Sequence, residues 1–146
     1  MFLRDCRPTD ELFSHQDLEG VSRHFNTTAM TCAVMARKIQ PSLIMLPLER
    51  WLVDHILQNN GVEPQHIEAA KARAEVPILV VVFPDDTTLI VDGNHRIVAR
   101  YAMGLPTVEA LQFFPGQWDE FLVTDIDVPL SLYGSQAQDT SLTVGA

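Results

Sequence analysis

The segment Asp92–Arg96, which reads DGNHR, combines residue types that suit the binding of an anion. A helix that begins at Asn94 would leave its first backbone N–H groups unpaired, and the positive end of its dipole would favour a negative charge there. Gly93 permits a positive φ and lets a ligand approach the backbone. Arg96 could place a planar fork of donors on phosphate oxygens, and His95 could add a donor or transfer a proton. The segment therefore predicts a phosphate site made by Gly93, Asn94, His95 and Arg96.

The same residues have a simpler interpretation, which the sequence leaves open. A junction of a strand, a glycine and a helix with an arginine is common in proteins. In that case Asp92 or Asn94 would only cap the helix, and His95 would lie on the surface. Arg96 would then pair inside the protein with Asp92 or Glu109.

The elements around this turn are clearly marked in the sequence. Residues Ile78–Phe83 are rich in β-branched side chains, and Pro84–Asp86 is typical of a turn. Residues Thr87–Val91 predict a second strand, so the two strands form a hairpin. We expect a helix from Asn94 to Met103 and another strand over Thr107–Phe113.

The preceding part of the chain reads mainly as helices. We expect a short helix over Asp17–Phe25 and a longer one over Thr28–Ile39, for which Asn26 provides a cap. A short strand follows at Leu43–Leu46. Two further helices are predicted, at Leu48–Asn59 and at Pro64–Ala74.

Length, charge and cysteines exclude several classes of protein. A chain of 146 residues is expected to form one domain. The net charge of −9 argues against a broad surface for duplex DNA, which needs many basic residues. The apolar run Val76–Phe83 is too short to cross a membrane, so we expect a soluble, cytoplasmic protein. Cys6 and Cys32 lack metal-ligand spacing, and Cys32 is expected to be a small buried side chain.

Residues 77–113 resemble the ParB/sulfiredoxin superfamily. Its general signature Gly-x-x-Arg is met by Gly93 to Arg96, and the DG-x-HR form of several members is met by Asp92, Gly93, His95 and Arg96. The strand, LPL and helix over Leu43–Leu57 are also similar to the family. The resemblance covers about half of the chain, and it implies a compact fold whose Gly-x-x-Arg turn binds nucleotide phosphates.

Departures from the family patterns separate its branches. Sulfiredoxins have a catalytic cysteine between the glycine and the histidine of this turn, where this chain has Asn94. Partition proteins carry a basic DNA-binding domain for which the chain has neither the room nor the charge. The branch of free-serine kinases is most similar at the DG-x-HR turn, and it uses an acidic residue after the first strand as a general base. The candidates here are Glu49, Asp54 and His55, although Glu49 could equally be a solvated helix residue.

The resemblance and the residues together predict an α+β fold, with a small mixed sheet surrounded by helices and an extra N-terminal helical segment. We expect a helical extension at 1–40, the nucleotide-binding domain at 41–133 and a flexible tail at 134–146. Trp118, Phe121 and Leu122 are expected to form a packed helical turn.

The predicted function is that of a phosphotransferase or hydrolase that uses ATP or another nucleoside triphosphate. Glu49 and His95 are the candidate catalytic residues, and Asp92 is the candidate ligand for Mg²⁺. The expected partners are the nucleotide and either a small-molecule acceptor or a protein. Two alternatives stay open: a ParB-like nuclease or DNA-associated accessory protein of the plasmid or phage type, and a non-catalytic acidic interaction protein with a vestigial site.

Overall fold

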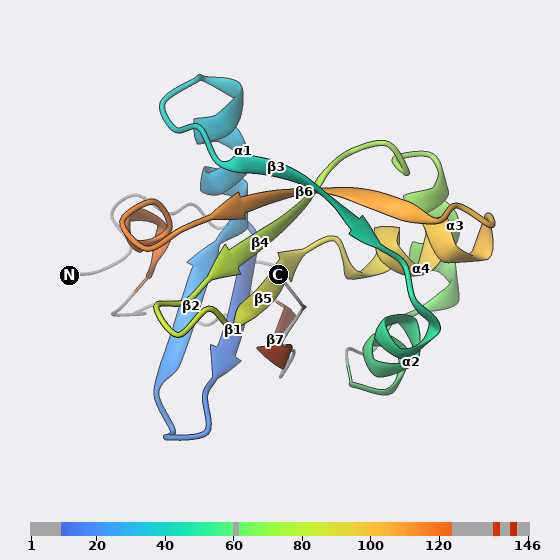
Figure 1. Cartoon of the computed structure of the whole chain (residues 1–146), viewed down its shortest axis with the longest axis horizontal. Coiled ribbons are helices and arrows are strands. Elements are labelled where there is room, and N and C mark those ends of the chain that lie inside the picture. The colour runs from blue at the N-terminus through green and yellow to red at the C-terminus, as the bar shows by residue number, and fades with distance from the viewer. Residues whose placement is uncertain (1–9, 60–61, 124–135, 138–140, 143–146) are drawn as a thin grey trace.

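The computed structural model describes residues 10–59, 62–123, 136–137 and 141–142, which form a small α+β protein. The larger sheet and a smaller N-terminal sheet are shown in Figure 1. The elements in chain order are β1 (Leu12–Gln16), β2 (Ser22–Asn26), α1 (Thr27–Met35), β3 (Ser42–Pro47), α2 (Arg50–Asn59), α3 (Pro64–Lys71), β4 (Ile78–Val82), β5 (Thr88–Asp92), α4 (Asn94–Ala102), β6 (Thr107–Phe113), the 3-10 turn η1 (Asp119–Phe121), β7 (Gln136–Ala137) and β8 (Ser141–Leu142).

The larger sheet has the strand order β3-β6-β4-β5-β8. Strand β6 pairs parallel with β4 and antiparallel with β3, while β4 and β5 form the predicted antiparallel hairpin. All five residues of β4 are buried, because protein packs on both faces of the sheet at this strand. The expected mixed sheet with surrounding helices is therefore confirmed, as are the strands predicted near β3 and β6.

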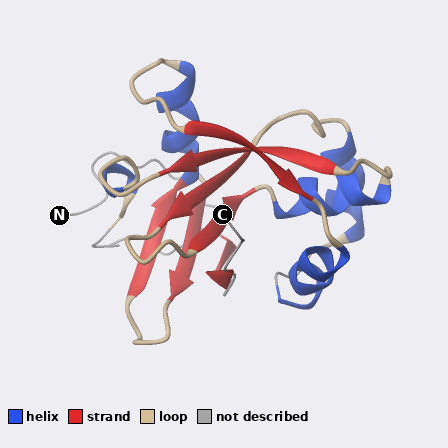
Figure 2. Ribbon diagram, viewed as in Figure 1, coloured by secondary structure: helices blue, strands red, loops and turns tan. Residues whose placement is uncertain are grey.

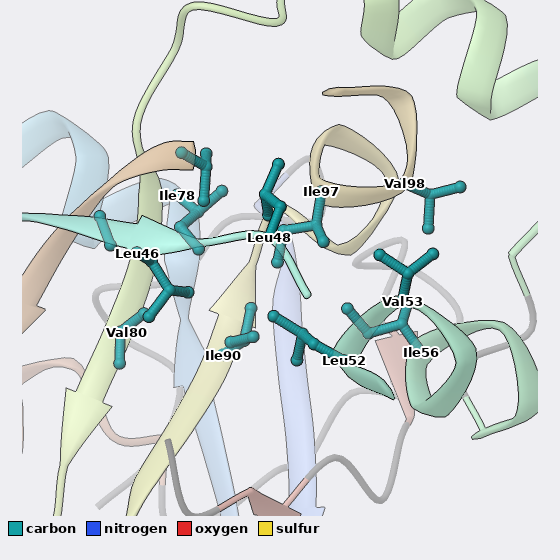
Figure 3. Close-up of a cluster of buried hydrophobic side chains, with 12 residues drawn as sticks. Leu46, Leu48, Leu52, Val53, Ile56, Ile78, Val80, Ile90, Ile97 and Val98 are labelled. Carbon is teal, nitrogen blue, oxygen red and sulfur yellow. The ribbon is translucent and has the colours of Figure 1, made fainter. Parts of the chain in front are cut away.

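One face of the sheet packs against helices. Figure 2 shows α2, α3 and α4 gathered together, with α1 apart from them. Figure 3 shows the core between these helices and the sheet, in which Ile78, Val80 and Ile90 meet Leu52 of α2 and Ile97 of α4. These side chains alternate along β4 and β5 with residues of the opposite face, as the period of a strand requires. This packing fixes the position of α4 against the end of β5.

The opposite face is covered by the N-terminal segment. Phe13 of β1, Phe25 of β2 and Met30 of α1 form a second core with Leu79 and Val81, the remaining members being Leu89, Val91, Phe113 and Trp118. The described part of this segment, from residue 10 onward, therefore shares a core with the larger sheet, whereas the sequence predicted a helical extension. Only α1 within this segment is the helix that was expected.

The short helix predicted over Asp17–Phe25 is wrong, because these residues form a turn and strand β2. Oδ1 of Asp17 accepts hydrogen bonds from the backbone N–H groups of Glu19 and Val21, both at 2.9 Å. Gly20 adopts φ +86° in the same turn. An aspartate that binds the backbone two and four residues ahead is typical of turns, and it competes with helix formation.

Helix α1 begins as predicted but differs from the prediction at Cys32 and at its end. Oδ1 of Asn26 caps it by accepting a hydrogen bond from the N–H of Ala29 at 2.9 Å, as expected. Met30 is buried, whereas Cys32 is exposed, so the prediction of a buried Cys32 is wrong. The helix ends before the predicted Ile39, since the backbone turns into the left-handed region at Arg37.

The C-terminal part contains the expected helical turn, η1, beside a buried Trp118. Within the tail predicted from residue 134 onward, β7 pairs with β1 and β8 pairs with β5. The other tail residues lie outside the described part of the chain, as does Cys6.

Candidate functional site

The junction between β5 and α4 depends on Gly93. This residue adopts φ +119° and ψ 12°, in the left-handed region that favours glycine. A Cβ atom at this position would lie 2.3 Å from Cγ2 and 2.7 Å from Cβ of Ile78. The carbonyl oxygen of Gly93 accepts the first bond of the helix, from the N–H of Ile97 at 2.9 Å. The close contact with Ile78 therefore sets the angle at which α4 leaves the sheet.

The N-terminus of α4 offers backbone donors. A helix leaves its first N–H groups without an acceptor in the helix, and no side chain caps this end. These groups and the helix dipole favour an anion, as the sequence predicted.

Asn94 is the unusual residue of the junction. It is only 3% exposed, yet neither Oδ1 nor Nδ2 has a hydrogen-bond partner among the described residues. A buried polar group without a partner costs about 1–3 kcal/mol, and such groups are rare in folded proteins. The amide of Asn94 thus has an acceptor and a donor group without partners among the described residues, at the first residue of α4.

His95 contacts a second histidine from another helix. The rings of His95 and His66, on α3, meet edge to face with their centroids 5.1 Å apart. Nε2 of His95 is buried and has no hydrogen-bond partner in the described part of the chain. Burial lowers the pKa of His95, and His66 lowers it further, while Glu63 and Asp92 oppose the shift. Burial therefore favours the neutral form of His95, which can accept a proton.

Arg96 lies inside the protein. It is 5% exposed. Its Nη1 donates to the carbonyl oxygens of Val76 at 3.2 Å and Pro77 at 2.8 Å, and its Nη2 donates to Oδ2 of Asp92 at 2.9 Å. These contacts occupy the fork of donors that the sequence analysis assigned to phosphate. They match the internal pairing with Asp92 that the simpler interpretation described.

Arg100 acts in the same way one helical turn later. Its Nε donates to the carbonyl oxygen of Thr107 at 2.7 Å, and its Nη1 donates to that of Ala74 at 2.8 Å. Together the two arginines bind carbonyl groups on both sides of α4, in the segment before β4 and at the start of β6. They fix the scaffold of the junction rather than a ligand.

The structure adds one acidic residue that the sequence analysis did not consider. The pKa of Glu11 is raised by partial burial and by the nearby Asp92, against the opposite effects of Arg73 and Arg96. Glu11 comes to this position because its backbone binds α1: its N–H donates to Oγ1 of Thr28 at 2.8 Å. Both Glu11 and His66 reach the junction through tertiary packing, so no local spacing in the sequence could identify them.

The predicted general base Glu49 lies in a different setting. It is exposed, its side chain accepts a hydrogen bond from Nε1 of Trp51, and its carbonyl oxygen accepts from the N–H of Leu52 at 3.1 Å. The other two candidates for this role, Asp54 and His55, also lie on α2. Asp54 forms an ion pair with Arg50, and His55 contacts Asn59. Among the described residues, no hydrogen bond or ion pair joins Glu49 to the Gly93–Arg96 turn.

Comparison with protein-family models, with curated proteins and with solved structures finds no match for this chain. The resemblance to the ParB/sulfiredoxin superfamily therefore rests on the residues quoted for it. Within the described residues, none of the helices has the length and apolar character needed to cross a membrane.

Proposed function

We propose that the chain binds a phosphate group of a nucleotide at the N-terminus of α4. The observation that carries this proposal is the buried amide of Asn94, which has no partner among the described residues. The adjacent backbone N–H groups and the helix dipole supply the positive potential that an anion needs. Nδ2 of Asn94 would donate to a phosphate oxygen, and Oδ1 would accept from a ligand hydroxyl or amino group.

Arg96 has a positioning role in this proposal. Its bond to Asp92 balances the nearest carboxylate, which would otherwise repel a phosphate. Its bonds to Val76 and Pro77 hold the segment that leads into Ile78, against which Gly93 is packed. The phosphate donors are thus the backbone and Asn94, in place of the bidentate arginine that the sequence suggested.

The proposed reaction is the transfer or hydrolysis of a phosphoryl group of ATP or another nucleoside triphosphate. Neutral His95 would accept the proton of the attacking hydroxyl group or water, since its Nε2 has no other partner among the described residues. Mg²⁺ does not fit Asp92 as the structure has it, because that carboxylate is paired with Arg96 and the described residues hold no group of three potential metal ligands. No step through a metal is proposed.

A thermal-shift and calorimetric panel tests the proposal. The ligands are ATP, ADP, CTP, GTP and inorganic phosphate, each with and without Mg²⁺. A ligand at 100 times its dissociation constant should stabilise the protein by about 2.7 kcal/mol. Asn94→Ala should weaken binding by about ten- to a hundredfold, the scale of a hydrogen bond to a charged group.

The matched control is Asn59→Ala, which removes an exposed amide at the end of α2. It should leave ligand binding unchanged. In the absence of ligand, Asn94→Ala should be at least as stable as the wild type, because it removes an unsatisfied buried group. Equal binding by Asn94→Ala and the wild type would overturn the site.

The second candidate function is that of a non-catalytic interaction protein with a vestigial site. The internal contacts of Arg96 favour it, since they remove the strongest cationic donor from the turn. The acidic chain would then bind a basic protein partner. If no ligand of the panel bound or stabilised the protein, that result would support this function over the first.

A further inference from the structure

A buried base needs a route by which its proton can leave. In the proposed reaction, Nε2 of His95 takes a proton from the attacking group, and this atom is buried without a hydrogen-bond partner among the described residues. A general base must return to its neutral form in every cycle, so the proton has to reach solvent afterwards. The side chains that adjoin His95 therefore decide how fast the site is reset.

His66 is placed to take this proton. Helix α3 packs against α4, and the rings of His66 and His95 meet edge to face, with their centroids 5.1 Å apart and an angle of 83° between their planes. The side chain of His66 is 59% exposed, whereas Nε2 of His95 is buried. His66 thus contacts the base on one side and solvent on the other.

Glu63 supports a proton on His66. Its Oε2 lies 4.0 Å from Nδ1 of His66, just before α3 begins at Pro64. The same oxygen accepts a hydrogen bond from Nε2 of Gln65 at 2.6 Å. A carboxylate beside an imidazole favours the protonated form of the ring. Both residues also act on the base itself, since Glu63 raises the pKa of His95 and His66 lowers it.

The remaining charged group that acts on His95 is Asp92, at the end of β5. Its effect is to raise the pKa of His95, as that of Glu63 is. The carboxylate of Asp92 is paired with Nη2 of Arg96 at 2.9 Å, and Arg96 is buried. A proton on Asp92 would break this ion pair, so Asp92 is the less suitable acceptor.

We propose that His66 carries the proton between Nε2 of His95 and solvent, with Glu63 stabilising it on His66. This inference rests on the proposed function, in which His95 is the base. After the product leaves, the N–H bond at Nε2 of His95 breaks, an N–H bond forms on the ring of His66, and the proton then passes to water or to a buffer base. Burial of His95 favours this direction of transfer. Exposed side chains change rotamer within nanoseconds, so the ring of His66 can turn from His95 to solvent.

Isotope-edited NMR of the histidine rings tests the relay without any substrate. In the wild type, protonated and neutral His95 should interconvert rapidly and give one averaged ring signal throughout a pH titration. His66→Ala should slow this exchange by about a hundredfold, the lower end of what a positioned proton-transfer group supplies, so that the signal of His95 broadens or splits. Imidazole added to the His66→Ala protein should restore the averaged signal, because it replaces the missing ring. The exposed position of His66 means that the variant should keep the melting temperature of the wild type.

Two further variants define the relay. Glu63→Gln should lower the pKa of His95 and slow the exchange less than His66→Ala does. His24→Ala is the matched control, since it removes a partly buried histidine from β2 of the smaller sheet and should leave exchange at His95 unchanged. Equal exchange in the wild type and His66→Ala, or a slowed exchange that imidazole does not restore, would overturn the relay.

Turnover separates this inference from the proposed function. If the chain hydrolyses or transfers a phosphoryl group, His66→Ala should lower kcat, leave KM unchanged and regain kcat when imidazole is added. An unchanged kcat in His66→Ala would overturn the relay and keep the reaction. A chain that binds no nucleotide, but whose His95 loses rapid exchange in His66→Ala, would overturn the proposed function and keep the relay.

Discussion

Two features require glycine at position 93: its positive φ and its close contact with Ile78. Gly93→Ala should destabilise the protein by about 3 kcal/mol, because the new methyl group meets Ile78 and the residue must keep a positive φ. Gly104→Ala is the matched control: its φ is +77°, but its Cβ would meet nothing within 4 Å. The control should cost only about 1 kcal/mol. Urea unfolding of the two variants measures the difference, and equal losses would contradict the role of Ile78.

Arg96 donates to two backbone carbonyl groups and one carboxylate in a partly buried setting. Arg96→Ala should therefore lower the free energy of unfolding by about 3 kcal/mol, since it leaves these acceptors without a donor. Arg96→Lys should recover part of this loss, because one ammonium group cannot reproduce the geometry of the fork. Chemical denaturation is the measurement.

The control for this prediction is Arg50→Ala. Arg50 has an 82% exposed side chain and a surface ion pair with Asp54 at 3.6 Å. Such pairs contribute little, so the change should stay within about 0.5 kcal/mol. If Arg96→Ala proved as mild as this control, and phosphate binding alone were lost, Arg96 would be a ligand residue rather than a positioning residue.

At the scale of elements, Trp118 connects the segment after β6 to strand β4 by packing and by a hydrogen bond. It is 6% exposed, and its Nε1 donates to the carbonyl oxygen of Val82 at 2.8 Å. Trp118→Phe should cost about 2 kcal/mol, from the lost donor and the smaller ring. Trp51→Phe, at a half-exposed site on α2, should cost less than about 0.5 kcal/mol. Thermal unfolding compares the two, and similar melting temperatures would contradict this docking role.

The elements that sequence could predict are those with a strong local pattern. The β4–β5 hairpin and α4 follow from β-branched runs, a proline turn and a helix between two glycines, and the structure has them near the predicted bounds. The β1–β2 hairpin was not predicted because its turn depends on hydrogen bonds that one aspartate, Asp17, accepts from the backbone within a polar segment.

Prediction of the candidate site was limited in the same way. Gly93, Asn94 and His95 lie at the junction because they are consecutive in the chain. The internal partners of Arg96 are backbone carbonyls, which every sequence contains, so their position could not be known before the fold. The contact of His66 with His95 depends on how α3 packs on α4.

At the scale of the whole molecule, two partly buried histidines couple stability to pH. Burial lowers the pKa of both His24 and His95 below the ordinary value of 6.5. The unfolded chain therefore takes up these protons at a higher pH than the folded protein does. The resulting stability is fully present above pH 6.5 and is lost as the pH falls through the folded pKa values.

The protein should accordingly have a lower free energy of unfolding at about pH 5.5 than at about pH 7.5. The lowered pKa values of Asp17 and Asp85 belong to more acidic ranges. The raised pKa of Glu11 acts with the opposite sign, because the folded protein takes up that proton at a higher pH than the unfolded chain does. Urea unfolding at the two pH values measures the loss. The double variant His24→Gln/His95→Gln should lose less stability on acidification than the wild type does. Glutamine cannot take up the proton that destabilises the folded state. If the double variant lost as much free energy of unfolding as the wild type does, other groups would be responsible for the acid sensitivity.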